Sequence, residues 1–182
     1  MDTFSFLPFQ NLKSERLILR QIVETDIEEV FALRSNAETM KYIPRPLAKT
    51  LDDALAHIKL IQSRIETNEG INWAVTLNGN DKFIGIASHH QIYWHNFRSE
   101  IGYMLLPEFH GQGIITEVVK LITEYGFNEM KMHSIEAIID PRNIASARVL
   151  EKNNFIKEAH FTENEFYNGE FVDTAIYSLI KR

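Results

Sequence analysis

Residues 98–116 constrain the fold more than any other part of this chain. They are apolar and alternating up to Leu106, Pro107 ends that strand pattern, and Gly111 and Gly113 precede a helical pattern. A glycine turn that leads into a helix directs several backbone N–H groups at one spot, where the helix dipole adds partial positive charge. Such a turn is suited to holding a phosphate group.

The glycine turn matches neither of two common phosphate loops. A dinucleotide-binding fingerprint requires Gly-x-Gly-x-x-Gly, and the position of its last glycine is occupied by Thr116. A P-loop requires Gly-Lys-Ser/Thr, and no such sequence follows Gly113. The turn alone therefore leaves two interpretations open, a phosphate loop of a third kind or a simple tight turn.

The remaining patterns predict a sheet flanked by helices. Strands are expected at 16–20, 71–77, 82–94, 98–106, 134–139, 155–162 and 171–179, and helices at about 25–34, from Thr50, from Gly113 and from Asn143. Residues 40–46 are expected to form an irregular connector, because they contain two prolines. Hairpins at both ends of one strand–helix–strand unit indicate an α+β fold. The expected structure is a mostly antiparallel, twisted sheet of about six to seven strands, flanked by about four helices.

Length, charge and cysteine content exclude several classes of protein. A chain of 182 residues is expected to form one domain, spanning 1–182. The absence of cysteine excludes disulfides and cysteine-based metal or nucleophile sites. A net charge of −6 disfavours nucleic-acid binding and favours a cationic substrate, although it also simply favours solubility. No apolar run is long enough for a membrane span, and Met1 to Phe9 do not resemble a signal peptide, so a cytoplasmic location is expected.

Several segments resemble one known family in the correct order. His110 to Ile115 is similar to the Arg/Gln-x-x-Gly-x-Gly/Ala loop of the GNAT superfamily of N-acetyltransferases, with His110 and Ile115 as departures. The wider string Glu100-Ile-Gly-Tyr…Pro107-Glu-Phe-His-Gly-Gln-Gly…Thr116-Glu117 resembles the Rim-type branch, the ribosomal-protein N-terminal acetyltransferases. Residues 140–155 and 167–177 extend the resemblance over nearly the whole chain.

The resemblance implies acetyl-CoA as co-substrate. Loop amides would hold its pyrophosphate, and its pantetheine arm would lie between strands 98–106 and 134–139, where an amide near Met104 or Leu105 polarises the thioester. Lys152 is expected either near the adenosine 3′-phosphate or on a solvated helix face. The cofactor-binding residues implied are Met104, Leu105, Leu106, His110, Gly111, Gln112, Gly113, Ile114, Ile115, Thr116, Asn143, Ser146 and Lys152.

Two residues are candidate catalytic groups. The resemblance implies that Glu100 accepts the proton of the acceptor amine through a water molecule. The other interpretation is that Glu100 is an exposed residue at the edge of a strand. The resemblance assigns to Ser146 a hydroxyl near the sulfur that protonates the departing thiolate, and to Asn143 a contact with pantetheine. From the residues alone, Asn143 is an ordinary N-cap and Ser146 a first-turn residue. Many enzymes of the family that the chain resembles use a tyrosine as this acid, and no tyrosine occurs here between Tyr125 and Tyr167, so the resemblance favours Ser146.

The seven histidines do not indicate a metal site. No His-Glu-x-x-His spacing occurs, and His89 and His90 are adjacent and point to opposite faces of a strand. His89 shares its face with Gln91, Tyr93 and His95 and is expected either to line the acceptor cleft or to be structural. No metal is therefore expected. A serine hydrolase is also not indicated, because no Gly-x-Ser-x-Gly occurs.

The resulting hypothesis is transfer of an acetyl group from acetyl-CoA to a primary amine, such as the N-terminus of a ribosomal protein. Two alternatives remain open, a small-molecule detoxifying acetyltransferase and a catalytically silent acyl-CoA-binding or regulatory module. No nucleic-acid or membrane partner is expected, and the chain is a monomer or a homodimer. Acceptor choice is expected to reside in residues 40–46, in the second helix and in hairpin 162–171.

Overall fold

The computed structural model describes residues 4–182, which form one eight-stranded sheet and five α-helices. The strands are β1 (Leu12–Lys13), β2 (Leu17–Gln21), β3 (Ile71–Leu77), β4 (Asn80–Tyr93), β5 (Arg98–Leu105), β6 (Ser134–Ile139), β7 (Ile156–Tyr167) and β8 (Glu170–Ile180). The helices are α1 (Ile27–Ser35), α2 (Ala37–Met40), α3 (Leu51–Glu66), α4 (Ile114–Asn128) and α5 (Ile144–Lys152).

The strand order is β1-β2-β3-β4-β5-β6-β8-β7, and every neighbouring pair is antiparallel except β5 and β6. This confirms the predicted α+β class with a mostly antiparallel sheet. The sequence patterns did not predict β1 or α2, which are only two and four residues long. Met1 to Phe9 are expected not to form a signal peptide, and residues 1–3 of this segment lie outside the described range.

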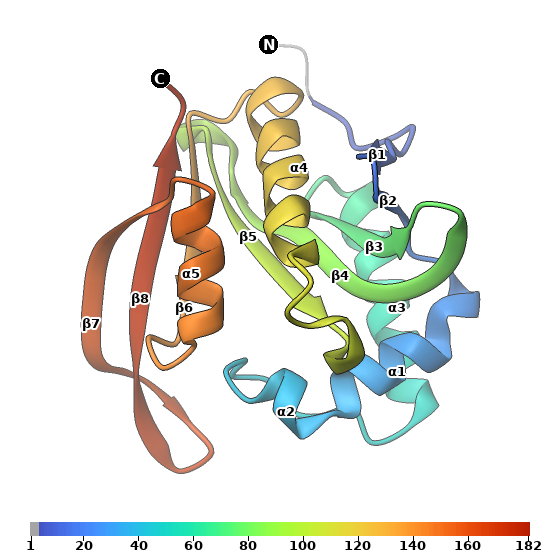
Figure 1. Ribbon diagram of the computed structural model, residues 1–182, viewed down its shortest axis with the longest axis horizontal. Coiled ribbons are helices and arrows are strands. Elements are labelled where there is room, and N and C mark those ends of the chain that lie inside the picture. The colour runs from blue at the N-terminus through green and yellow to red at the C-terminus, as the bar shows by residue number, and fades with distance from the viewer. Residues whose placement is uncertain (1–3) are drawn as a thin grey trace.

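The helices lie on both faces of the sheet. Figure 1 shows α4 and α5 in front of the sheet and α3 behind it, and α1 packs against α3. The expected cap of α3 is confirmed, since Thr50 Oγ1 accepts the Asp53 N–H at 3.2 Å and Asp53 Oδ2 accepts the Thr50 N–H at 3.0 Å. Among residues 4–182, no helix is long and apolar enough to cross a membrane.

The parallel pair β5 and β6 separates soon after it begins. Residues 98–100 of β5 pair with residues 134–136 of β6, and beyond them the two strands have no shared register. Figure 1 shows the strands diverging toward the lower end of the molecule. We call this opening, between residues 101–105 and 137–139, the fork. Among residues 4–182, β5 pairs along the fork only with β4, so the backbone edge of β5 that faces β6 has no strand partner there.

Candidate active site

The glycine turn lies between β5 and α4 and presents unpaired backbone donors. Gly111 and Gly113 have φ values of +74° and +75°, a region that favours glycine. Gly113 is the N-cap of α4, as predicted, and no side chain caps the helix. Within the described part of the chain, the N–H groups of residues 111–116 have no hydrogen-bond acceptor. Six consecutive donors at a helix N-terminus form a strong anion site.

The side chains of the turn hold it to the protein instead of extending from it. His110 Nε2 donates to the Leu105 carbonyl at 2.9 Å, and Gln112 Nε2 donates to the Glu108 carbonyl at 3.1 Å. Ile114 is buried in the core, so its side chain does not contact a ligand bound at the turn. His110 thus ties the loop to the end of β5.

The hydrogen-bond alternation of β5 decides which amides face the fork. The Leu106 N–H donates to the Ile84 carbonyl of β4 at 2.9 Å. Because antiparallel pairs alternate between bonded and non-bonded positions, the backbone of Met104 also faces β4 and that of Leu105 faces the fork. Of the three residues expected to supply backbone groups, Leu105 therefore has its N–H directed into the opening.

Tyr103 and Ser146 meet across the fork. The Tyr103 hydroxyl lies 2.7 Å from Ser146 Oγ, which joins β5 to the start of α5. Burial raises the pKa of Tyr103 to about 12, against a smaller lowering by the bond from Ser146. Asn143 is the N-cap of α5, because its Oδ1 accepts the Ser146 N–H at 3.1 Å. Tyr103 was not among the site residues predicted from the sequence. It lies three residues after Glu100, on the opposite face of the strand.

Glu100 lies on the other face of β5, where the fork begins. It is buried, and its Oε1 lies 3.1 Å from Nε2 of His90 on β4. Its partner in the parallel register is Glu136, whose pKa is raised by burial, lowered by Arg98 and raised again by Glu100 and Glu158, with a net increase. Arg98 Nε lies 3.6 Å from Glu136 Oε1. Two carboxylates, each with its own basic neighbour, therefore lie side by side at the base of the fork.

His89 does not line a cleft, which corrects one of the two sequence-based expectations for it. The ring is completely buried, with Nδ1 2.9 Å from Ser99 Oγ and Nε2 2.8 Å from the Ile122 carbonyl of α4. A β-bulge follows it in β4, because His89 pairs with Ile101 while Gln91 pairs with Glu100. The bulge breaks the strict alternation on which the grouping of His89 with Gln91 depended.

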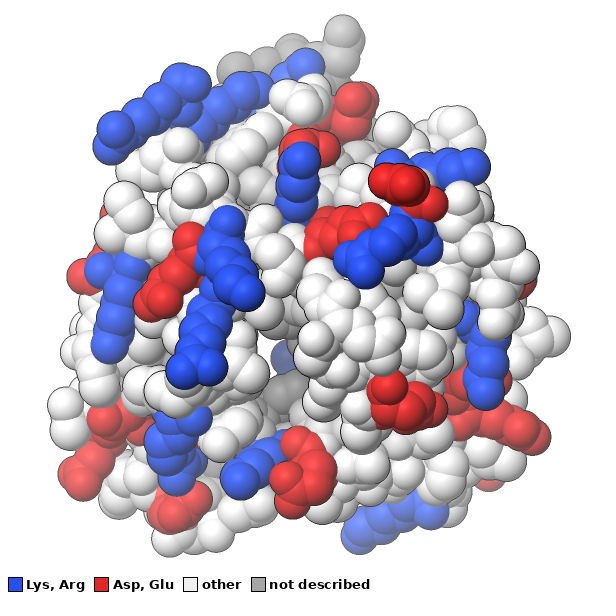
Figure 2. Space-filling model, viewed as in Figure 1, with Lys and Arg blue, Asp and Glu red and all other residues white. Residues whose placement is uncertain are grey.

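The α5 side of the fork is positively charged at its surface. Arg148 and Lys152 are exposed on α5, and Figure 2 shows Lys and Arg side chains over this helix beside a hollow in the surface. Asn153 Nδ2 donates to the Thr116 carbonyl at 3.2 Å, which links the end of α5 to the first turn of α4. Lys152 thus lies on the helix that borders the loop, and its side chain is directed to solvent.

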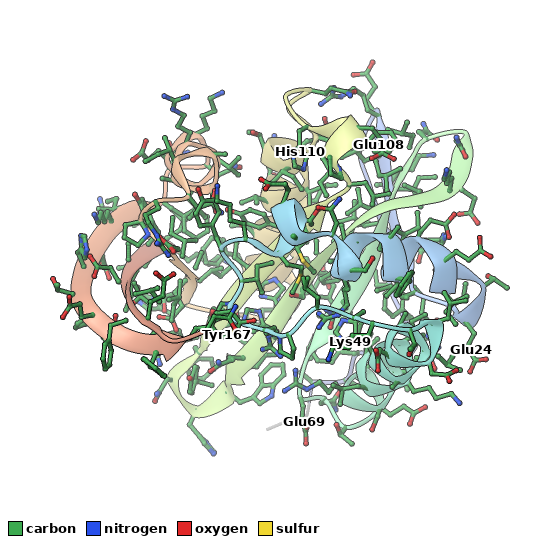
Figure 3. All side chains as sticks on the ribbon, turned by 90° about the horizontal axis from the view of Figure 1, so that it is seen from below. Glu24, Lys49, Glu69, Glu108, His110 and Tyr167 are labelled. Atoms are coloured by element: carbon green, nitrogen blue, oxygen red, sulfur yellow. The ribbon has the colours of Figure 1, made fainter. Side chains whose placement is uncertain are left out.

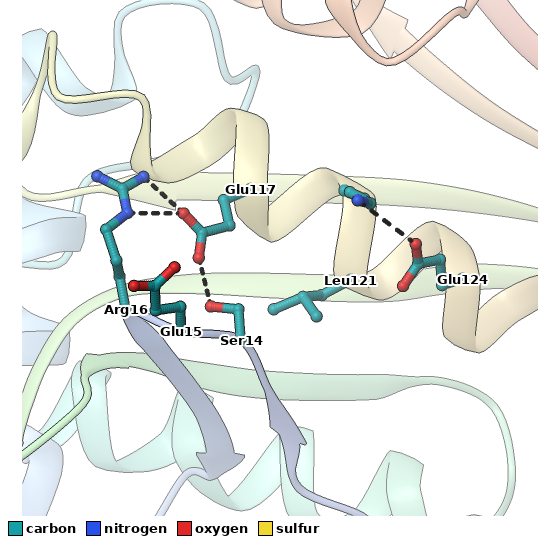
Figure 4. Close-up of a pocket in the computed structure, with 7 residues that line it drawn as sticks. Ser14, Glu15, Arg16, Glu117, Leu121 and Glu124 are labelled. Carbon is teal, nitrogen blue, oxygen red and sulfur yellow. Dashed lines mark hydrogen bonds and ion pairs between the residues drawn. The ribbon is translucent and has the colours of Figure 1, made fainter.

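A second hollow, of about 300 Å³, lies beside α4 on the side of β1 and β2 and is separate from the fork. Figure 4 shows its residues, among which Arg16 Nε donates to Glu117 Oε2 at 2.8 Å and Ser14 Oγ donates to Glu117 Oε1. Burial raises the pKa of Glu117, but the bonds from Ser14 and Arg16 outweigh it and leave that pKa lowered. These contacts fix the first turn of α4, which carries the glycine turn.

Figure 3 looks into the molecule from below and separates the two sides of the site. Glu108 and His110 lie toward one side of the ribbon, and Lys49 and Tyr167 lie toward the other. The connector after α2 and the β7–β8 hairpin therefore lie away from the glycine turn. Within residues 4–182, no group of three His, Asp or Glu side chains is arranged to hold a metal ion.

Comparison with known proteins identifies the family. A family model described as an acetyltransferase (GNAT) domain matches residues 16–156, more than half of the chain. The chain belongs to the GNAT family. YoaA, an uncharacterized N-acetyltransferase of Bacillus subtilis, is 32% identical over 173 residues, which cover 95% of this chain and 98% of YoaA. The chain is therefore an N-acetyltransferase, and acetyl transfer is its chemistry.

Two solved acetyltransferase structures share the fold at low identity. RimL, a ribosomal L7/L12 alpha-N-protein acetyltransferase in complex with coenzyme A, has a TM-score of 0.85 at 20% identity and covers 94% of this chain and 98% of its own. The spermidine N-acetyltransferase of Vibrio cholerae, in complex with CoA and spermine, has a TM-score of 0.81 at 21% identity over 92% and 96%. At these identities the similarity shows a shared fold and nothing more.

Proposed function

We propose that this GNAT enzyme binds acetyl-CoA in the fork and transfers its acetyl group to a primary amine, first of all the N-terminal amine of a protein. The observation that carries the proposal is the row of six unpaired N–H groups at residues 111–116, next to the open edge of β5. These donors suit the pyrophosphate of CoA. The fork then receives the pantetheine arm, and the 3′-phosphate is attracted by Arg148 and Lys152, which are exposed on the helix that Asn153 links to the first turn of α4.

Glu100 is the proposed acceptor of the proton from the amine. An α-amine has a pKa near ~8 and a lysine-like amine near ~10.4, so at neutral pH most of the acceptor is protonated and cannot attack. A carboxylate at the base of the fork can take that proton, directly or through one water. The Leu105 N–H is the proposed donor to the thioester oxygen as negative charge develops on it.

Ser146 is the proposed hydrogen-bond donor to the leaving thiolate. Tyr103, its partner at 2.7 Å, has a pKa raised to about 12 by burial. A thiol has a pKa of roughly 8.5, so proton transfer from a phenol with a pKa of about 12 to the thiolate is unfavourable at equilibrium. The Tyr103–Ser146 pair therefore stabilises the thiolate by hydrogen bonding, and the proton that neutralises it comes from the attacking amine or from solvent.

Two features of the acceptor side favour different amines. The β7–β8 hairpin exposes Phe166 and Phe171, whose rings pack at a tilt of 56° with centroids 4.9 Å apart, and this apolar surface suits a peptide. Glu100 and Glu136, adjacent in register, suit a second positive charge on a small polyamine. RimL and the spermidine enzyme represent these two acceptor types among proteins of this fold. A polyamine is therefore the second candidate.

A thiol-release assay with acetyl-CoA separates these candidates. The panel contains peptides with free α-amines, the same peptides with blocked N-termini, and polyamines. We expect release with free α-amines and none with blocked peptides; a clear preference for polyamines would exchange the first candidate for the second. Binding of CoA without transfer to any amine would contradict the enzymatic proposal and indicate a silent CoA-binding module.

A further inference from the structure

His90 is the basic neighbour of the proposed base. Within residues 4–182 it is the one basic side chain within 4 Å of the Glu100 carboxylate, at 3.1 Å between Nε2 and Oε1. The His90 side chain is 24% exposed and that of Glu100 only 10%. The imidazole therefore lies between a buried carboxylate and the solvent.

The backbone is shaped to place this ring. His90 is the extra residue of the β-bulge, since His89 pairs with Ile101 and Gln91 with Glu100. Bulges frequently redirect a side chain next to an active site. The ring lies over Gly102, where an added Cβ would be 3.3 Å from Nδ1 and Cε1 of His90. A bulge in one strand and a glycine in the next therefore both make room for the imidazole.

The basic neighbours of Glu100 and Glu136 differ in their ability to transfer a proton. Glu136, beside Glu100 in register, has Arg98 at 3.6 Å, and a guanidinium keeps its proton at all accessible pH values. Imidazole gains and loses a proton near neutral pH. His89, the preceding residue, is bonded on both ring nitrogens within the core and is not available for exchange. Of the basic side chains that residues 4–182 place around the two carboxylates, only His90 is an imidazole that is not hydrogen-bonded within the core.

We propose that His90 carries the acceptor's proton from Glu100 to solvent, a role it has only if Glu100 is the base proposed above. The acceptor ammonium loses a proton to the Glu100 carboxylate, directly or through water. Glu100 passes it to Nε2 of His90 in its neutral Nδ1–H form, and the imidazolium releases the proton on Nδ1 to water, which restores the carboxylate. Proton exchange of the neutral ring with water then returns it to the Nδ1–H form for the next cycle. His90 also holds Glu100 in place, so it is a positioning residue with a proton-transfer function.

The test is chemical rescue. His90→Ala leaves a space over Gly102 and should lower kcat about 10-fold while both KM values stay nearly unchanged. Added imidazole should restore kcat, because it can fill that space and exchange protons. His90→Gln keeps an N–H donor but cannot exchange a proton, so it should remain slow with imidazole. His133→Ala, at an exposed histidine, is the matched control and should behave as wild type.

A double variant shows whether His90 acts through Glu100. Adding His90→Ala to Glu100→Gln should cause no further loss of kcat, and imidazole should not rescue it. Wild-type kcat and an unchanged pH–rate profile in both His90 variants would overturn the inference and leave the acetyltransferase proposal intact. A wild-type enzyme that transfers no acetyl group would instead refute the proposed function itself.

Discussion

The Tyr103–Ser146 contact gives a prediction at the scale of single residues. Ser146→Ala removes the hydroxyl but keeps the cap of α5, because Asn143 accepts the backbone N–H of residue 146. A hydrogen bond to a charged group contributes about 1.5–3 kcal/mol, so kcat should fall roughly 10- to 100-fold with little change in the acetyl-CoA KM. Tyr103→Phe should lower kcat less. Steady-state kinetics check this, and an effect on KM alone would make Ser146 only a binding residue.

Single residues also mark where sequence reasoning stops. The Asn143 cap and the start of α4 at Gly113 follow from local backbone chemistry, and both were predicted correctly. Of the two expectations for His89, the structural one is confirmed. Its grouping on one face with Gln91 was wrong, because one extra residue in β4 changes which side chains share a face. The meeting of Tyr103 with Ser146 joins residues 43 apart, and no local pattern reports such a contact.

The start of α4 gives a prediction at the scale of one element. Gly113 and Gly79 both have positive φ, at +75° and +85°, and an added Cβ meets no atom within 3.5 Å at either position. Alanine at either site should therefore cost about 1–2 kcal/mol through the left-handed backbone. Only Gly113→Ala should also weaken CoA binding, because the methyl group lies in the proposed phosphate loop. Calorimetric titration with CoA checks this; equal affinities in the two variants would contradict it.

Most elements were predictable because glycine, proline and asparagine mark their ends. The hairpin at Asn78-Gly79 and the stop at Pro107 are read from the sequence, and the strand at 134–139 was predicted with its observed bounds. β1 and α2 were missed because two and four residues are too few for a periodic pattern. The divergence of β5 and β6 depends on long-range register, which periodicity alone does not contain.

Stability of the whole molecule should fall as the pH is lowered. Burial lowers the pKa of His89 to about 4, and burial together with Arg34, Arg45 and Arg64 lowers that of His57 to about 4. The unfolded chain binds these protons near pH ~6.5, so it takes up more protons than the folded chain between about pH 6.5 and 4. His89 alone should cost roughly 2 kcal/mol of unfolding free energy between pH 7 and pH 5.

Urea unfolding at pH 7 and pH 5 measures this loss. His57→Gln should show a smaller decrease than the wild type, because one of the two neutral histidines is gone. NMR of labelled histidine should find the His89 ring still neutral at pH 5. An unfolding free energy that does not change between pH 7 and pH 5 would contradict this account. The His89 ring that joins β4 to α4 would then not be buried in its uncharged form.

The rate of acetyl transfer by Glu100→Gln tests the central claim most directly. Glutamine keeps the size of the side chain and removes its basicity, so the rate at pH 7 should fall about 10²–10⁴-fold while CoA affinity stays nearly unchanged. Raising the pH should recover part of the loss, since solvent then deprotonates the amine. A near-normal rate and pH profile would contradict the account, and the site would then supply only proximity and hydrogen-bond donors to amines already deprotonated in solution.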